Sequence, residues 1–148
     1  MILSSSVSGE SKEIAHFYSA LAREIRQYGR PLKPPACLIA GGETTVNVGG
    51  KGKGGRCQEL ALAVAMDIQD VEGVVFLAAG TDGVDGPTEA AGAIADSSTI
   101  DRAKYLGLDP ESALSGNDAN TFFHALSDLV NTGPTGTNVM DIHILLVG

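Results

Sequence analysis

Two aspartates in a glycine-rich segment are the residues of this sequence best placed to do chemistry. Asp82 and Asp85 stand three residues apart, each beside a glycine, within residues 80–88. A carboxylate can hold a metal ion or take up a proton, and the glycines let the backbone approach a ligand closely. We therefore predict that Asp82 and Asp85 either bind a metal ion or take up a proton from a ligand. The alternative for this segment alone is a plain turn, because Asp-Gly pairs are common turn formers.

A second candidate site combines three cations with glycine. Lys51, Lys53 and Arg56 lie in or beside a segment in which seven of the fifteen residues from 41 to 55 are glycine. A helix is expected to begin at Arg56 or Cys57, and the free N–H groups and positive end of such a helix attract anions. We predict a site for phosphate or carboxylate, with Arg56 as its main ligand because a planar guanidinium matches two oxygens. The alternative is a mobile, solvated loop.

The same segment satisfies the pattern G-x-G-x-x-G through Gly50, Gly52 and Gly55. A dinucleotide site requires that pattern between a strand and a helix, but a glycine-dense segment also fits it by chance. The Walker A pattern fails, because no Gly-Lys-Ser/Thr follows Gly49. A dinucleotide site is therefore only weakly indicated.

Two further loops are polar enough to contact a ligand. Residues 117–123 begin with Asn117, whose alternative role is to cap a helix. Residues 132–138 precede a strand, and a structural turn is their alternative role. The candidate ligand contacts in this last loop are Thr135, Gly136, Thr137 and Asn138. If these loops share one rim of a sheet, their joint polarity marks a binding site.

Composition narrows the classes of function. The chain has 148 residues, of which 43% are hydrophobic, and this is enough for one domain with a real core. A net charge of −8 disfavours nucleic acid as a partner. No signal peptide and no apolar span of membrane length is present, so we expect a soluble, cytoplasmic protein with no membrane partner. The two cysteines lack metal-binding spacing and the three histidines are scattered, so structural roles are expected for them.

The order of the expected elements indicates an α/β fold, with a mixed sheet in a single domain. Strands are expected at residues 2–7, 36–40, 44–48, 73–79, 93–95 and 141–147, and residues 41–43 would turn a hairpin. Helices are expected at residues 8–28, 56–66, 97–105 and 118–130, with a short helical turn from 109. The apolar strand 73–79 would be central. The two aspartates would then lie at the carboxyl end of a strand, where open α/β sheets bind ligands.

Four segments together resemble the MOFRL family, in order and at plausible spacing: residues 41–46, 55–59, 80–88 and 132–138. The similarity runs from about residue 9 to residue 147. MOFRL domains form the C-terminal part of the class II glycerate 2-kinases, whose bacterial members often carry the name hydroxypyruvate reductase. The resemblance implies transfer of the γ-phosphoryl group of ATP, with Mg²⁺, to the 2-hydroxyl group of D-glycerate. The active site would be a cleft between this domain, residues 1–148, and a larger N-terminal α/β domain.

The resemblance also implies residue roles. Arg56 would hold the glycerate carboxylate or the transferring phosphate, and Asp82 would act as a general base or a metal-side carboxylate, supported by Asp85. The other residues predicted to bind substrate or anion are Glu43, Thr44, Lys51, Lys53, Gly80, Thr81, Gly83, Thr88, Asn117, Thr135, Gly136, Thr137 and Asn138. One departure is Cys57, which stands where the family usually has asparagine.

The sequence contains no N-terminal kinase domain, so we expect the chain alone to be inactive. We also expect the surface that such a domain would cover to favour homo-oligomers. Two other functions stay open at this point. One is an NAD(P)H-dependent hydroxypyruvate reductase, which the glycine pattern supports, and the other is a non-catalytic module that binds small anions.

Overall fold

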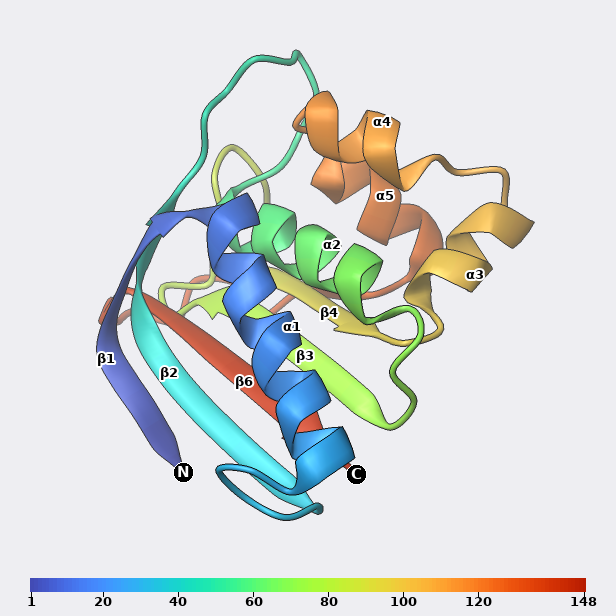
Figure 1. Ribbon diagram of the computed structural model, residues 1–148. Coiled ribbons are helices and arrows are strands. Elements are labelled where there is room, and N and C mark those ends of the chain that lie inside the picture. The colour runs from blue at the N-terminus through green and yellow to red at the C-terminus, as the bar shows by residue number, and fades with distance from the viewer.

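Successive side chains of β2 (Ala36–Thr45) and β6 (Asp141–Val147) point to opposite faces of the sheet, so each strand buries one face and leaves the other more exposed. In the computed structural model, which describes all residues 1–148, six strands form one mixed sheet and five helices accompany it. Figure 1 shows the long helices lying across one face of that sheet. The predicted α/β fold with a mixed sheet is confirmed.

The directions of the strands bring the polar loops together. The strand order is β1 (Ile2–Glu10), β2, β6, β3 (Val74–Gly80), β4 (Gly92–Asp96) and β5 (Leu129–Val130). β1 and β2 are parallel, and every other pair of neighbours is antiparallel. Consequently β1, β2, β3 and β5 end at the same edge of the sheet at which β4 and β6 begin. We call this edge, with the loops 46–55, 81–91 and 131–140, the loop edge.

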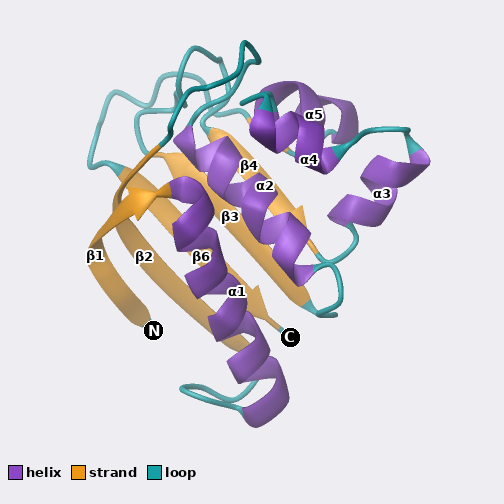
Figure 2. Ribbon diagram, turned by 45° about the horizontal axis from the view of Figure 1, so that its top comes forward, coloured by secondary structure: helices purple, strands orange, loops and turns teal.

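The helices form a single layer on the sheet. α1 (Ser11–Tyr28) and α2 (Arg56–Ile68) lie side by side across it (Figure 2). α2 occupies the centre of the molecule, and ten of its thirteen residues are buried, which accounts for its Leu- and Ala-rich sequence. The three short helices, α3 (Thr99–Tyr105), α4 (Pro110–Ser115) and α5 (Ala119–Leu126), gather beyond α2. The core between helices and sheet contains Tyr18, Ile25, Leu60, Phe76 and Leu145.

The predicted hairpin at residues 41–43 is wrong, because β2 runs unbroken from Ala36 to Thr45. The two glycines serve the sheet instead of a turn. Gly42 has a φ of 151°, and a Cβ atom there would collide with the backbone of Val7 in β1. The close approach of a neighbouring strand therefore explains the glycine.

Several element ends also differ from the prediction. α1 begins at Ser11 instead of residue 8, because residues 8–10 continue β1 and pair with β2. α5 ends at Leu126, where Ser127 takes a φ of 62°, and the short strand β5 follows. Two predicted helix ends are confirmed: Gly29 ends α1 with a φ of 64°, and Asp109 caps α4.

The second face of the sheet is apolar and carries no helix. Ile39, Val75, Ile94 and Leu146 are each between 36% and 43% exposed. The strand register places Ile39 beside Ile144, Ile144 beside Leu77, and Leu77 beside Ile94, so aliphatic side chains form continuous rows. We call this surface the open face. None of the helices is long and apolar enough to span a membrane.

Candidate functional site

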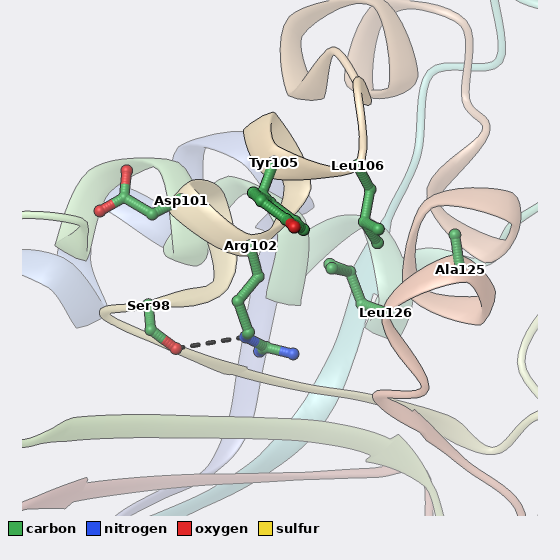
Figure 3. A pocket seen from close by; sticks show the side chains of 7 residues that line it. All are labelled: Ser98, Asp101, Arg102, Tyr105, Leu106, Ala125 and Leu126. Atoms are coloured by element: carbon green, nitrogen blue, oxygen red, sulfur yellow. Dashed lines mark hydrogen bonds between the residues drawn. The ribbon is translucent and has the colours of Figure 1, made fainter.

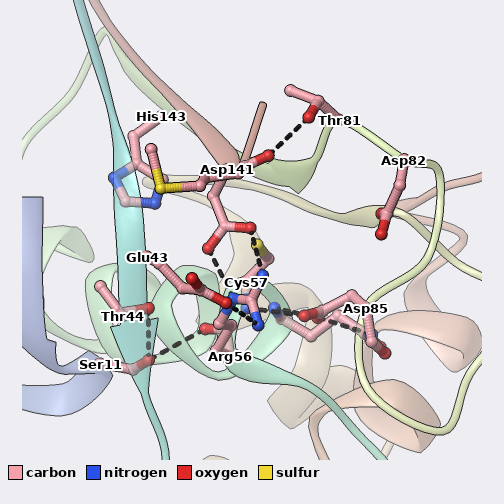
Figure 4. A network of polar contacts seen from close by, with 12 residues as sticks. Ser11, Glu43, Thr44, Arg56, Cys57, Thr81, Asp82, Asp85, Asp141 and His143 are labelled. Atoms are coloured by element: carbon pink, nitrogen blue, oxygen red, sulfur yellow. Dashed lines mark hydrogen bonds and ion pairs between the residues drawn. The ribbon is translucent and has the colours of Figure 1, made fainter. Parts of the chain in front are cut away.

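Arg56, the first residue of α2, is held by two carboxylates at the loop edge. Its Nε and Nη2 atoms donate to both oxygens of Asp141, at 2.7 and 2.9 Å, and Nη1 lies 3.0 Å from Oε1 of Glu43 (Figure 4). The hydrogen bonds to Asp141 are the main reason that the pKa of Arg56 is raised above its usual range. Arg56 is therefore permanently charged and fixed in direction, while about a third of its side chain stays exposed.

Asp141 belongs to this candidate site, although sequence reasoning missed it. Its side chain is fully buried at the start of β6, and both of its oxygens bind Arg56. Residue 141 pairs with Gly42 of β2 and with Gly80, the last residue of β3, so Asp141 stands at the loop edge beside the end of β3. The available signal was an acidic residue opening a mostly apolar strand.

Asp85 caps α2 from a separate loop. Its carboxylate accepts hydrogen bonds from the backbone N–H groups of Cys57 and Gln58, at 3.1 and 2.9 Å, and from Nε2 of Gln58 at 2.9 Å. Burial raises the pKa of Asp85, against the lowering effect of these hydrogen bonds. The positive end of α2, which we predicted to be free for an external anion, is thus partly occupied by an internal one.

Two of the predicted ligand contacts support this cap and its surroundings. Oγ1 of Thr88 accepts from Nε2 of Gln58 at 3.0 Å and donates to the carbonyl oxygen of Asp85 at 2.8 Å. Oγ1 of Thr44 accepts from Oγ of Ser11 at 3.0 Å, which joins the start of α1 to β2. Both threonines are buried. The structure places them beneath the loop edge, in bonds within the chain.

Residues 46–55 rise from β2 to α2 as an arch, which we call the glycine arch (Figure 1). At one foot, the carboxylate of Glu10 accepts from the backbone N–H and Nδ2 of Asn47, at 3.1 and 2.9 Å. At the top, Oδ1 of Asn117 accepts from the N–H groups of Gly49 and Gly50, at 3.0 and 2.8 Å.

The arch also rests on the turn between α4 and α5. The N–H of Gly52 donates to the carbonyl oxygen of Gly116 at 2.9 Å, and that of Lys53 donates to Oδ1 of Asp118 at 2.8 Å. These contacts hold the arch in place, and they do not fit the alternative of a mobile loop. Lys51 and Lys53 are exposed on it. Asn117 holds the arch and does not cap α5, whose N-cap position is Asp118.

A cavity of about 490 Å³ lies beneath the glycine arch. Four of the predicted site residues line it: Glu43, Thr44, Arg56 and Asn117. Its wall also includes Gly54 and Gly55, whose backbone N–H groups donate to no acceptor within the chain. The cavity therefore offers two free backbone donors beside a fixed guanidinium, an arrangement that suits an anion.

Asp82 lies on the next loop of the same edge. Its carboxylate accepts from the N–H of Val84 at 3.1 Å and from Nδ2 of Asn138 at 3.3 Å. The N–H of Thr135 donates to the carbonyl oxygen of Asp82 at 3.1 Å, and Oγ1 of Thr81 donates to that of Met140 at 2.7 Å. The loops 80–88 and 132–138 are thus joined.

Three glycines of the predicted site and one further threonine belong to this pair of loops. Gly83 has a φ of 89°, and a Cβ there would collide with the backbone of Gly133. Gly80 pairs with Asp141 in the sheet, which links the pair of loops to the Arg56 site. Gly136 and Thr137 are exposed. Figure 4 shows Asp82 on its loop across from Arg56, with Asp141 between β3 and the guanidinium.

The predicted metal site does not emerge as a cluster. No group of three or more His, Cys, Asp or Glu side chains is arranged to hold a metal ion. Both oxygens of Asp85 face the start of α2, so its contacts fit a capping role and not metal binding. The carboxylate of Asp82 is only partly buried and stays available. The thiol of Cys57 is buried, and burial raises its pKa, so it is not a nucleophile.

Comparison with known proteins gives a consistent result. Residues 36–141 match the MOFRL family. A D-glycerate 2-kinase of Thermotoga maritima is 47% identical over 146 residues, which are 99% of this chain and 35% of that protein. A glycerate 2-kinase of Pyrococcus horikoshii is 42% identical over 147 residues, covering 99% of this chain and 33% of that protein.

Solved structures agree with the sequence comparisons. The crystal structure of a glycerate kinase from Thermotoga maritima superimposes with a TM-score of 0.98 at 47% identity, covering 100% of this chain and 36% of that one. The chain therefore spans about a third of the length of the relatives that it matches. A protein of Agrobacterium vitis that is 39% identical over 150 residues carries the name putative hydroxypyruvate reductase. The kinases above are more similar to this chain, so the reductase alternative is not favoured.

Proposed function

Because the chain belongs to the MOFRL family, we propose that it is the C-terminal domain of an ATP-dependent glycerate 2-kinase, which phosphorylates the 2-hydroxyl group of D-glycerate. The observation that carries the proposal is the position of Arg56, held by two carboxylates beside the cavity under the glycine arch. Phosphoryl transfer relies on positioning and charge neutralisation more than on covalent help from the protein. A fixed guanidinium beside free backbone donors supplies both.

Arg56 keeps donors for a substrate. Its internal contacts use Nε, Nη1 and Nη2 once each, which leaves one N–H on each terminal nitrogen. The side chain of Glu43 is 55% exposed, so it can turn away when a substrate carboxylate or phosphate arrives. Asp141 is buried and cannot turn away, so it keeps the guanidinium in place.

The charges near Arg56 require further cations. Arg56, Asp141 and Glu43 together carry a net charge of −1, which weakens the attraction for an anion. Lys51 and Lys53 on the arch supply positive charge, and the Mg²⁺ of a bound nucleotide would supply more. Mg²⁺ is commonly held by one or two carboxylates together with substrate phosphates. Asp82 fits that need, whereas Asp85 is already engaged with α2.

Asp82 has two candidate roles in the proposed reaction. It would take the proton from the 2-hydroxyl group as that oxygen bonds to the γ-phosphorus and the bond from this phosphorus to the departing ADP breaks, or it would hold the metal ion. In either role, Asp82→Asn in a complete enzyme leaves the unfolding midpoint nearly unchanged and lowers kcat by more than about a hundredfold. A steady-state assay measures kcat of the wild type and the variant, and thermal unfolding measures the midpoint of each protein. A twofold loss of rate would exclude general-base catalysis by Asp82.

The proposed function needs a partner domain, because the relatives are about three times as long as this chain. We propose that an N-terminal kinase domain closes over the loop edge and completes the cleft. A homo-oligomer formed through the open face is a second proposed assembly, since its aliphatic rows are available for packing.

Reconstitution tests the kinase proposal. The chain is mixed with the separately expressed N-terminal part of the Thermotoga maritima D-glycerate 2-kinase, and ATP-dependent formation of 2-phosphoglycerate is measured. We expect activity from the mixture and none from either part. A folded, stable complex without activity would count against a catalytic role and would favour the module that only binds small anions.

A further inference from the structure

The cavity under the glycine arch has a buried acceptor in its wall. Glu59, on the first turn of α2, is 2% exposed and lines the cavity. One of its carboxylate oxygens, Oε2, accepts from Nδ2 of Asn117 at 2.9 Å. The other, Oε1, has no hydrogen-bond partner. Nζ of Lys12 lies 3.9 Å from Oε1, which is close enough to contribute charge but too far for a hydrogen bond.

An unpaired buried carboxylate oxygen is costly, because it has lost its water and gained no donor in exchange. That burial raises the pKa of Glu59, against the lowering effects of Asn117 and Lys12. Gly54 and Gly55 line the same cavity, and their backbone N–H groups donate to no acceptor within the chain. The cavity thus presents an acceptor without a donor and two donors without an acceptor.

We propose that this cavity binds a small hydroxylated anion, whose anionic group accepts from the N–H groups of Gly54 and Gly55 and whose hydroxyl group donates to Oε1 of Glu59. Glu59 is then the residue that selects a hydroxylated ligand over a plain anion. The inference rests on the proposed function in one respect, because D-glycerate is a ligand of this class. The ribose and phosphate of a nucleotide share the same chemistry, so the test must separate the two sources.

A series of ligands that differ only in hydroxyl groups tests the inference by calorimetry on the 148-residue chain. D-glycerate is compared with D-lactate, 3-hydroxypropanoate and propanoate, which retain one or none of its two hydroxyl groups. AMP is compared with its 2′,3′-dideoxy analogue. We expect the hydroxylated member of one of the two sets to bind about tenfold or more tightly than its deoxygenated counterpart, as for a hydrogen bond to a charged group. The set that shows the difference identifies the source.

A matched pair of variants links the effect to Glu59. Glu59→Gln keeps the shape and an oxygen for Asn117, and it should remove most of the dependence on hydroxyl groups while leaving the affinity for propanoate within about twofold. Glu13→Gln removes the same charge from an exposed position on α1. It should change neither the dependence on hydroxyl groups nor the affinity for propanoate. The amide signals of Gly54 and Gly55 in ¹H–¹⁵N spectra of the unmodified chain give a readout that does not depend on a variant. They should shift with the hydroxylated ligand.

Three results would overturn the inference. The first is equal affinity for D-glycerate and propanoate together with equal affinity for AMP and its 2′,3′-dideoxy analogue. The second is unchanged selectivity in a folded Glu59→Gln variant. The third is no saturable binding of any probe. The kinase proposal is judged separately by the reconstitution assay. A reconstituted enzyme that is active with Glu59→Gln at unchanged KM for glycerate and ATP would leave the kinase reading intact and remove Glu59 from ligand selection.

Discussion

Two cavities of similar size on this molecule differ in their chemistry. The cavity under the glycine arch measures about 490 Å³, and a hollow between α3 and α5 measures about 430 Å³ (Figure 3). In the hollow, Arg102 is paired with Asp128 at 2.7 Å and receives further contact from Ser98, while Tyr105 and Leu106 stand exposed. Under the arch, Glu59 and two glycine N–H groups lack partners. Hydrogen-bonding groups without partners therefore distinguish the candidate site better than volume does.

The largest effect on stability is expected at the cap of α2. Asp85→Ala leaves the buried N–H groups of Cys57 and Gln58 without acceptors, so the free energy of unfolding should fall by about 2–4 kcal/mol. Asp128→Ala breaks the partly exposed pair with Arg102 beside the hollow and should cost less than about 1 kcal/mol. Urea unfolding measures both. Equal losses would erase the contrast between the two regions.

The next largest effect is the pH dependence of stability that is caused by His143, beneath the loop edge. His143 is buried against Tyr18, and burial lowers its pKa from 6.5 to about 4. Between these values the unfolded chain binds a proton that the folded chain does not, so stability falls as the pH drops from 6.5 to about 4. His143 should contribute a loss of up to about 3 kcal/mol. Unfolding of the wild type and His143→Gln across this range isolates the contribution, and parallel pH profiles would contradict it.

The third largest effect is expected on ligand affinity, when the replacement of Arg56 is compared with that of Arg102. Arg56→Ala should weaken binding of phosphate or glycerate by about 1–3 kcal/mol, the range for a charge-assisted hydrogen bond. Arg102→Ala, in the hollow, removes the same charge and should leave the dissociation constant unchanged. Calorimetry with both variants checks this. An unchanged constant for Arg56→Ala would remove that residue from the site.

The smallest expected effect is a gain in anion affinity. Glu43→Gln removes a carboxylate that competes with the ligand for Nη1 of Arg56, so anion affinity should rise about two- to threefold. Asp101→Asn, which lines the hollow, is the matched control and should have no effect. Weaker binding by Glu43→Gln would mean that Glu43 contacts the ligand directly and favourably.

Local signals in the sequence predicted most of the elements. The apolar runs of β3 and β6, the glycine after α1 and the Asp-Pro start of α4 depend on neighbours in sequence, and each was predictable. The glycine pair at 41–42 was misleading, because its purpose is contact with a distant strand. In a single sequence, a glycine pair looks the same whether it forms a turn or lies where a neighbouring strand leaves no room for a side chain.

The candidate site was less predictable because its bonds join distant residues. Asp85 caps a helix that begins 29 residues earlier, and Asp141 pairs with an arginine 85 residues away. No short sequence pattern predicts the register of β6 with β3 or the approach of the 81–91 loop to α2. The sequence could therefore indicate that Arg56 and Asp82 belong to one edge, but it could not separate ligand contacts from residues that support them.

The open face and the loop edge would respond differently to solution conditions. Aliphatic side chains such as Ile39, Ile94 and Leu146 leave water with little enthalpy change near room temperature, so contacts made there would tolerate salt and strengthen on moderate warming. Contacts made at the loop edge involve Arg56, Lys51 and several carboxylates, and they would weaken as ionic strength rises. Varying temperature and salt independently would thus tell which side of the chain an associating molecule touches.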